Sequence, residues 1–225
     1  VKSKEELERL ELSATIAERS AVKTFEMTRP GMDFQQLVEN YRSELATRGA
    51  DFDHFSFGFR GLGIASEPSY HLSKNDVLYV DFACVYQHYF GDSGATLALR
   101  EPTNALKERY TALYESIQAA ASIMSPGVKS SYVCQQMWNV LKSRGVTRLF
   151  PHGHGIGLEF RDYPIIVMDN GLFITDDCVN EPSDLPLESG MVINLEAGMF
   201  IAGVGSLQVE QSFQITNNSS KPLLL

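Results

Sequence analysis

The stretch "RPGMDFQQLVENYRSELATRG", residues 29–49, decides the fold because its pattern returns later in the chain. The stretch "SPGVKSSYVCQQMWNVLKSRG", residues 125–145, aligns with it without a gap, 96 residues further along. The matching positions are Pro30 and Pro126, Gly31 and Gly127, Leu45 and Leu141, Arg48 and Arg144, and Gly49 and Gly145. Any two helix-turn-helix stretches share part of this pattern, but a true repeat predicts a pseudo-symmetric body with two helix pairs.

Apolar residues at helical spacing predict both pairs of helices. The first pair covers 3–26 and about 34–48, with Asp33 capping the second helix and Gly49 closing it. The second pair covers 105–124 and a helix within 125–145. Strand-like sequence follows each pair, at 55–66 and 76–99 and then at 147–160, 191–202 and 207–216. We therefore predict an α/β (α+β) fold in which strands pack against four helices.

Composition excludes several classes of protein. A chain of 225 residues with 44% apolar content can build a substantial core, and no apolar run approaches the roughly 20 residues that span a bilayer. A formal charge of -9 argues against a nucleic-acid partner. Cys84, Cys134 and Cys178 are odd in number and form no CxxC motif, as expected of reduced thiols in the cytoplasm. The first residue is Val1, which leaves room for an upstream domain.

Four acidic residues interrupt apolar strand sequences: Asp81, Asp92, Glu196 and Glu210. A lone carboxylate costs several kcal/mol to bury, so each acid either faces solvent from its strand or has a partner. Two divalent cations would neutralise all four, and His154 stands in a nearby glycine-rich strand. Four carboxylates with one imidazole suit manganese, iron, cobalt or zinc.

One long excursion interrupts the second half. Residues 168–190 keep neither helical nor strand periodicity and are rich in Asn, Asp, Pro and Gly. A loop of this length in a compact domain is often a lid or a binding element. We expect it to restrict access to the site.

The order Asp81, Asp92, "HGIGLE" from His154, "NLEAGM" with Glu196 and "QVEQS" with Glu210 resembles the five-ligand signature of the pita-bread metallopeptidases. This family includes methionine aminopeptidase, aminopeptidase P and prolidase, and creatinase shares its fold. The resemblance implies a pseudo-twofold curved antiparallel sheet flanked by two helix pairs, with 1–225 as one catalytic domain. In many relatives a creatinase-type domain precedes it.

The resemblance also implies roles for these residues. Asp81, Asp92, His154, Glu196 and Glu210 would bind two metal ions that activate a water, and Glu196 would accept its proton. His152 shares a strand face with His154 and is a further catalytic candidate.

The sequence departs from the family at three places. Arg161 and Asp162 stand where peptidases of the family carry a histidine followed by an acid, and arginine cannot shuttle a proton. We expect Arg161 to clamp a substrate carboxylate, although a surface ion pair is the alternative. Gln208 replaces an arginine that would orient Glu210.

The third departure concerns a second histidine that the family carries well upstream of the first metal aspartate. Here the only candidate is His71, which lies too close to Asp81 in the sequence unless the loop between them is shortened. His88 and His152 are substitutes by position. His54 has no motif around it, and we expect it to be structural or exposed.

We therefore predict a dinuclear metal-dependent hydrolase that resembles Xaa-Pro dipeptidases and aminopeptidases and acts on a small peptide or amide. Non-peptidase chemistry on the same fold, as in creatinase, is one alternative, and the missing histidine favours it. A catalytically inert peptide-binding relative is another, against which the complete ligand set argues. We expect a homodimer, as is common for compact enzymes.

Overall fold

The computed structural model describes the chain except for residues 59–69, 147–149, 170–172, 177–178, 183 and 225. The first half contains α1 (Lys4–Met27), α2 (Phe34–Thr47), β1 (Asp51–Gly58), β2 (Val77–Tyr86) and β3 (Tyr89–Ala98). The second contains α3 (Asn104–Ile123), α4 (Ser130–Ser143), β4 (Phe150–Gly155), β5 (Asp162–Ile165), β6 (Phe173–Asp176), β7 (Val179–Pro182), β8 (Val192–Ile201), β9 (Gly205–Ile215) and β10 (Ser220–Pro222).

The repeat seen in the sequence is a repeat in space. Helices α2 and α4 begin and end 96 residues apart, at Phe34 and Ser130 and at Thr47 and Ser143. Gly31 and Gly127 have φ values of 90° and 89°, which a residue without a Cβ adopts readily. The caps differ, because the Asp33 side chain accepts a hydrogen bond from Gln35 N, whereas Lys129 makes no side-chain cap. The helix-pair prediction is confirmed.

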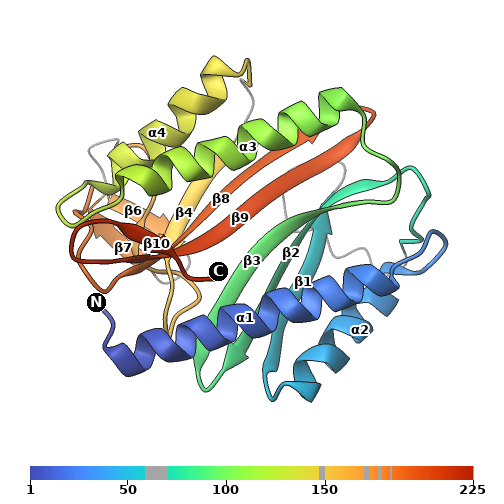
Figure 1. Cartoon of the computed structure of the whole chain (residues 1–225), viewed down its shortest axis with the longest axis horizontal. Coiled ribbons are helices and arrows are strands. Elements are labelled where there is room, and N and C mark those ends of the chain that lie inside the picture. Colours follow the sequence, from blue (N-terminus) through green and yellow to red (C-terminus); the bar gives the residue numbers. More distant parts are fainter. Residues whose placement is uncertain (59–69, 147–149, 170–172, 177–178, 183, 225) are drawn as a thin grey trace.

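Most of the described strands form two antiparallel sheets that lie side by side, and β6 and β7 form a separate two-stranded sheet. One has the order β1-β2-β3 and the other the order β10-β9-β8-β4-β5, with β3 alongside β9 (Figure 1). At this central junction Thr96 Oγ1 donates to the carbonyl of Gln208 and accepts from its N–H, both at 2.9 Å. The single curved sheet of the prediction is therefore divided where β3 meets β9, because side-chain bonds there take the place of a strand ladder.

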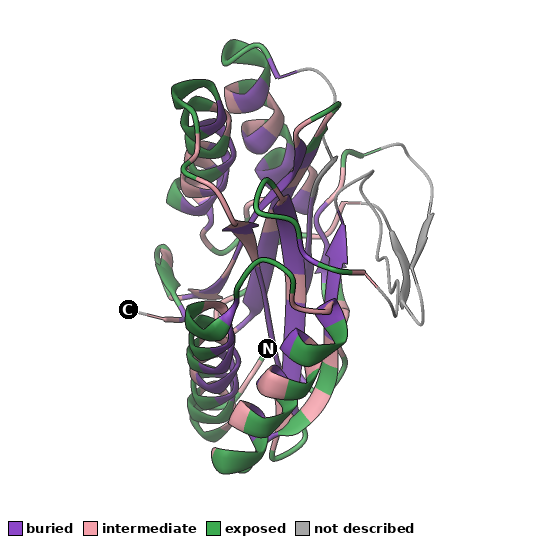
Figure 2. Ribbon diagram, turned by 90° about the vertical axis from the view of Figure 1, so that its right-hand side faces the viewer, coloured by how far each residue is buried: buried purple, intermediate pink, exposed green. Residues whose placement is uncertain are grey.

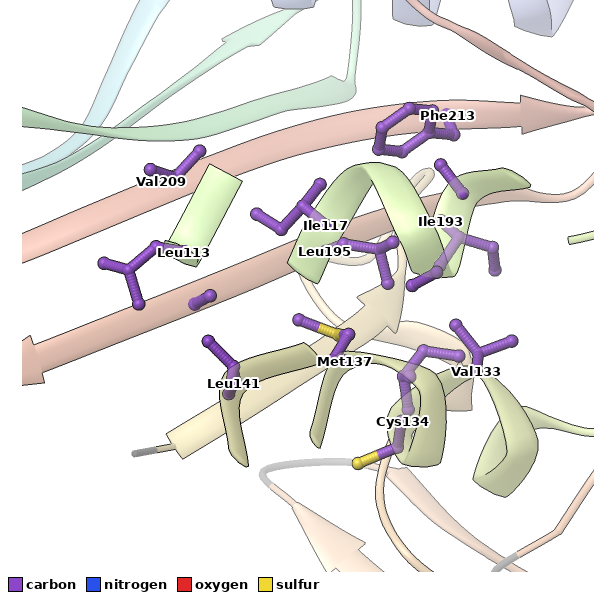
Figure 3. Packing of buried hydrophobic residues seen from close by; sticks show 14 of the residues in the cluster. Leu113, Ile117, Val133, Cys134, Met137, Leu141, Ile193, Leu195, Val209 and Phe213 are labelled. Atoms are coloured by element: carbon purple, nitrogen blue, oxygen red, sulfur yellow. The ribbon is translucent and has the colours of Figure 1, made fainter. Parts of the chain in front are cut away.

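Each helix pair covers one face of its own sheet. Helices α1 and α2 pack on Val80 and Phe82 of β2, while α3 and α4 pack on Ile193 and Leu195 of β8 (Figure 3). The strand centres are buried, and the helices are buried only on one side (Figure 2). Because side chains alternate along a strand, the residues between these apolar ones point to the opposite face.

Local predictions were less accurate outside the helices. Strand β1 begins at Asp51, before the predicted 55, and 59–66 lie outside the described residues. The excursion 168–190 contains the backbone hairpin β6-β7, and β5 and β10 were not predicted. Short strands form only when a partner strand offers its hydrogen bonds, so sequence alone gives little sign of them.

Two of the three cysteines are buried thiols. Neither Cys84 nor Cys134 forms a disulfide, and burial raises the pKa of both thiols to about 11, so they are unreactive near neutral pH. Cys178 lies outside the described residues. In the part of the chain that the structure describes, no helix is both long and apolar enough to cross a membrane.

Candidate metal centre

The four strand acids lie on the sheet faces that the helices do not cover. Asp81 and Glu196 are each the fifth residue of their strands, β2 and β8, and Glu196 pairs directly with Glu210 of β9. The Asp92 side chain is only 2% exposed, and Glu210 is also buried. The alternative that the acids face solvent is therefore wrong for Asp92 and Glu210.

Asn194 joins the two buried acids across the central junction. Its Nδ2 donates to Asp92 Oδ2 at 2.9 Å and to Glu210 Oε1 at 2.5 Å. Gln208 Nε2 donates to the other oxygen, Glu210 Oε2, at 2.6 Å. The glutamine therefore orients Glu210 without the charge that an arginine would bring. Asn194 was not predicted from the sequence, although a polar residue two before Glu196 in an apolar strand is a usable signal.

The two histidines of β4 both reach carboxylates of the site. His154 is fully buried, with Nε2 3.5 Å from Asp92 Oδ2 and Nδ1 2.9 Å from the carbonyl of Gly155. Because Nδ1 donates to that carbonyl, Nε2 keeps a lone pair for a ligand. His152 Nδ1 lies 2.7 Å from Glu196 Oε1. The predicted common face of His152 and His154 is present.

The four carboxylates of the site lie close enough together to repel one another and to shift one another's pKa values. Burial and repulsion from Asp92, Asp81 and Glu196 raise the pKa of Glu210 well above its usual value. Burial also raises the pKa of Asp81, despite its hydrogen bond with His54. In contrast, the hydrogen bond and charge of His152 outweigh burial and lower the pKa of Glu196. Bound cations would remove this repulsion.

His54 lies at the site, contrary to the prediction that it is structural or exposed. Its Nε2 is 3.0 Å from Asp81 Oδ1 and its Nδ1 is 2.8 Å from Asp53 Oδ2. Burial lowers the pKa of His54, but the hydrogen bonds and charges of Asp53 and Asp81 outweigh it and raise the pKa to about 10. The prediction was wrong because β1 brings His54 beside β2, a neighbourhood that no local motif marks.

The other upstream histidines lie elsewhere. His71 has a side chain 69% exposed and lies 3.8 Å from Asp33, at the start of α2. His88 is exposed in the turn between β2 and β3, with a φ of 74°. Neither takes the place of the upstream histidine.

Arg161 lies in the turn between β4 and β5, near Glu196. Its charge contributes to the lowered pKa of Glu196, and its guanidinium carbon lies 5.9 Å from the centre of the Phe160 ring. The neighbouring Asp162 accepts a hydrogen bond from Lys2 Nζ at 2.8 Å. The turn that carries Arg161 is therefore tied to the start of the chain.

The residues present fit divalent metal binding. Among the described residues, Asp92 Oδ1 and Asn194 Oδ1 are buried without a hydrogen-bond partner, and such atoms normally have one. Gly94 adds to the fit, because a Cβ there would collide with the side chains of Glu210 and Gln208. Carboxylate oxygens and imidazole nitrogens form the donor set that suits manganese, iron, cobalt and zinc.

Known proteins resemble this chain over nearly its whole length. The Xaa-Pro dipeptidases of Pyrococcus horikoshii and Pyrococcus furiosus are 26% and 25% identical to it over 232 residues. Each match covers 99% of this chain but 62% of the relative, so the chain spans less than two thirds of their length.

Solved structures confirm the predicted fold. Prolidase from Pyrococcus furiosus superposes with a TM-score of 0.82 at 26% identity, covering 99% of this chain and 64% of that one. X-Pro aminopeptidase from Thermotoga maritima gives a TM-score of 0.87 at 23% identity, covering 100% and 62%, and supports the fold alone. The model of metallopeptidase family M24 matches residues 8–217. The chain belongs to metallopeptidase family M24.

Proposed function

We propose that this chain is the catalytic domain of a divalent-metal-dependent hydrolase that cleaves Xaa-Pro dipeptides. The observation that carries the proposal is the meeting of Asp92 and Glu210, buried acids from two different sheets, around one shared Asn194 amide. The relatives named Xaa-Pro dipeptidase support the substrate class. We also infer a homodimer, as is common for compact enzymes, and a location in the cytoplasm, where thiols such as Cys84 and Cys134 stay outside disulfides.

The metal-holding residues would be Asp81, Asp92, His154, Glu196 and Glu210. Two ions of manganese, iron, cobalt or zinc fit this donor set. When bound, such ions polarise a carbonyl and lower the pKa of water to near neutrality. The surrounding side chains position the substrate and the attacking water relative to these ions.

Glu196 is the proton acceptor in this proposal. His152 holds its Oε1 at 2.7 Å, which leaves the second oxygen to take a proton from the attacking water. The lowered pKa of Glu196 keeps the group ionised, and therefore able to accept, at neutral pH. His152 is a positioning residue for Glu196 in this arrangement.

Arg161 would bind the free carboxylate of a dipeptide. A guanidinium stays charged, offers several donors and matches a carboxylate in two-pronged geometry. It cannot move a proton as histidine does, so proton transfer is left to Glu196. This requirement for a substrate carboxylate favours dipeptides over long peptides.

The decisive assay uses protein reconstituted with Mn²⁺ or Co²⁺ and a panel of Xaa-Pro and Xaa-Leu dipeptides. We expect turnover of Xaa-Pro dipeptides, at least about 100-fold slower in Glu196→Gln, since general base catalysis contributes this much. Arg161→Ala should raise KM more than it lowers kcat, with exposed Arg144→Ala as the matched control.

Creatinase-like amidine or amide chemistry is the second candidate, and Arg161 in place of the family histidine is the observation that favours it. Metal-loaded protein that cleaves no dipeptide yet turns over a small amidine or amide would establish it. Metal-loaded protein that binds dipeptides without turning over either class would mark an inert binding relative.

A further inference from the structure

We propose that His54 is an additional metal ligand of this site, so that the ion held by Asp81 and Asp92 takes a nitrogen that the five-residue signature does not contain. The inference rests on the proposed metal centre and deepens it. It concerns which ions the centre prefers as well as which residues hold them.

The register of the first sheet places His54 at the site. His54 pairs with Ala83 of β2, and Ala83 pairs with Asp92 of β3, so the three residues form one row across the sheet. Asp81 lies two residues before Ala83 and therefore on the same face. Since Ala83 has only a methyl group, the space above it is bounded by His54, Asp81 and Asp92.

The ligand atoms are close enough to share one ion. His54, Asp81 and Asp92 each offer one donor atom, and these atoms all lie within 4.8 Å of one another. The His54 side chain is 20% exposed and the Asp81 side chain is 17% exposed. The three side chains are therefore largely shielded from solvent, but an ion from solution can still reach them. A cation at its centre would be within reach of all three donors.

The hydrogen bonds of His54 match those of a metal-binding histidine. Its Nδ1 lies 2.8 Å from Asp53 Oδ2, and a carboxylate on one ring nitrogen is the usual support for coordination through the other. His154 is built alike, with Nδ1 anchored to Gly155 O and Nε2 directed to Asp92. Both imidazoles pack against Phe160, with ring centroids 5.4 and 5.6 Å away.

A second imidazole changes the expected choice of metal. Nitrogen ligands favour cobalt, iron and zinc, whereas an all-oxygen environment suits manganese. We therefore expect this centre to prefer Co²⁺ over Mn²⁺ by a wider margin than a variant that lacks His54.

X-ray absorption on the Co²⁺-loaded protein tests the proposal directly. The wild type should show at least two imidazoles for each pair of cobalt ions, and His54→Ala should show one fewer. Calorimetric titration should show that one site of His54→Ala binds Co²⁺ about 10- to 100-fold more weakly than in the wild type. The ratio of Co²⁺ affinity to Mn²⁺ affinity should also be smaller in this variant. His71→Ala, an exposed histidine on the same half, is the matched control and should match the wild type.

The outcomes separate this inference from the proposed function. An unchanged imidazole count and Co²⁺ affinity in His54→Ala overturns the inference, as does a wild type with a single imidazole or without bound cobalt. Loss of one imidazole in His54→Ala together with no dipeptide hydrolysis by the wild type supports His54 coordination and rejects the peptidase assignment. Asp53→Ala removes only the Nδ1 partner and should weaken Co²⁺ binding less than His54→Ala does.

Discussion

Asn194 shows how one uncharged side chain can organise two buried charges. Asp92 and Glu210 come from different sheets and repel one another, and burial together with this repulsion raises the pKa of Glu210. The Asn194 amide donates one hydrogen bond to each, which fixes the spacing of two proposed ligands. A partner of this kind is often worth 10- to 100-fold in metal affinity.

Replacement of Asn194 by alanine should therefore weaken binding of Co²⁺ or Mn²⁺ by about 10- to 100-fold. The carboxylates would remain, but they would lose the donor that holds them in position. Isothermal titration calorimetry measures the effect. Asn217→Ala, which removes an exposed asparagine bonded only to Ser189 in the described structure, serves as the control, and equal affinities for the two variants would refute the positioning role.

Residues differ in how far the sequence reveals them. Asp81, Asp92, His154, Glu196 and Glu210 stand in motifs that can be read in order along the chain. Asn194 is marked in the sequence only as a polar residue within an apolar strand. His54 carries no such mark, because its importance comes from partners in space. For His54 these partners are Asp53 and Asp81, and the latter is brought near only by the pairing of β1 with β2.

At the scale of single elements, the turn between β4 and β5 owes its position to the first residues of the chain. Lys2 donates from its backbone N–H to the carbonyl of Gly190 and from Nζ to Asp162, both at 2.8 Å. The Lys2 side chain is only 7% exposed. Because Asp162 follows Arg161, this ion pair helps to hold the proposed carboxylate clamp.

The Lys2–Asp162 ion pair should make the free energy of unfolding depend on pH in the acidic range. Burial opposes ionisation of Asp162, but Lys2 outweighs it and lowers the pKa of Asp162 below its usual 3.8. The stabilisation is therefore complete above about pH 3.8 and lost as pH falls through the folded-state pKa. Asp162→Asn should cost about 1 kcal/mol at pH 7, and the difference from wild type should shrink in acid.

Urea unfolding at pH 7 and at pH 3 measures this difference. Glu8→Gln breaks the exposed Lys4–Glu8 pair and should leave stability nearly unchanged at both pH values. A constant difference between wild type and Asp162→Asn across pH would show that the ion pair contributes nothing.

The cap of α2 offers a second prediction at this scale. Asp33 accepts from Gln35 N at 2.9 Å, and Gln36 completes a capping box with it. Asp33→Ala should lower the free energy of unfolding by about 1 kcal/mol. Thermal unfolding checks this, with exposed Asp51→Ala as the control, and equal midpoints for the two variants would contradict it.

At the scale of the whole molecule, the two halves repeat one plan but do not work separately. The core under α1 and α2 and the core under α3 and α4 are distinct clusters. They meet at the central junction, where Thr96 and Gln208 exchange two hydrogen bonds. We therefore expect the halves to unfold together as one cooperative unit.

Matched core variants test this cooperativity. Leu37 and Leu113 are fully buried in the two different cores, so Leu37→Ala and Leu113→Ala should each cost about 2 to 5 kcal/mol. Trp138 on α4 is the single tryptophan of the chain and reports on the second half alone. Its fluorescence and the far-UV circular dichroism should show one midpoint even in Leu37→Ala, and separate midpoints would disprove coupling.

The plan of the molecule follows largely from local signals. The Pro-Gly breaks, the apolar spacing and the Arg-Gly endings place the boundaries of α1, α2 and α3 within a few residues and α4 within 125–145, because these determinants act over one or two turns. The division into two sheets could not be predicted, since it depends on how β3 and β9 approach each other. Strands β5, β6, β7 and β10 were missed because short strands form only where a partner strand offers its hydrogen bonds.

The central junction also defines where the polypeptide could be cut. A break between β3 and α3 would leave two fragments, each with its own helices and sheet. The donors of the site would be shared out, with His54, Asp81 and Asp92 on one fragment and His154, Glu196 and Glu210 on the other. Neither fragment would carry the whole set, so a cation bound by residues of both would hold the two fragments together. The visible absorption of bound Co²⁺ would report their association.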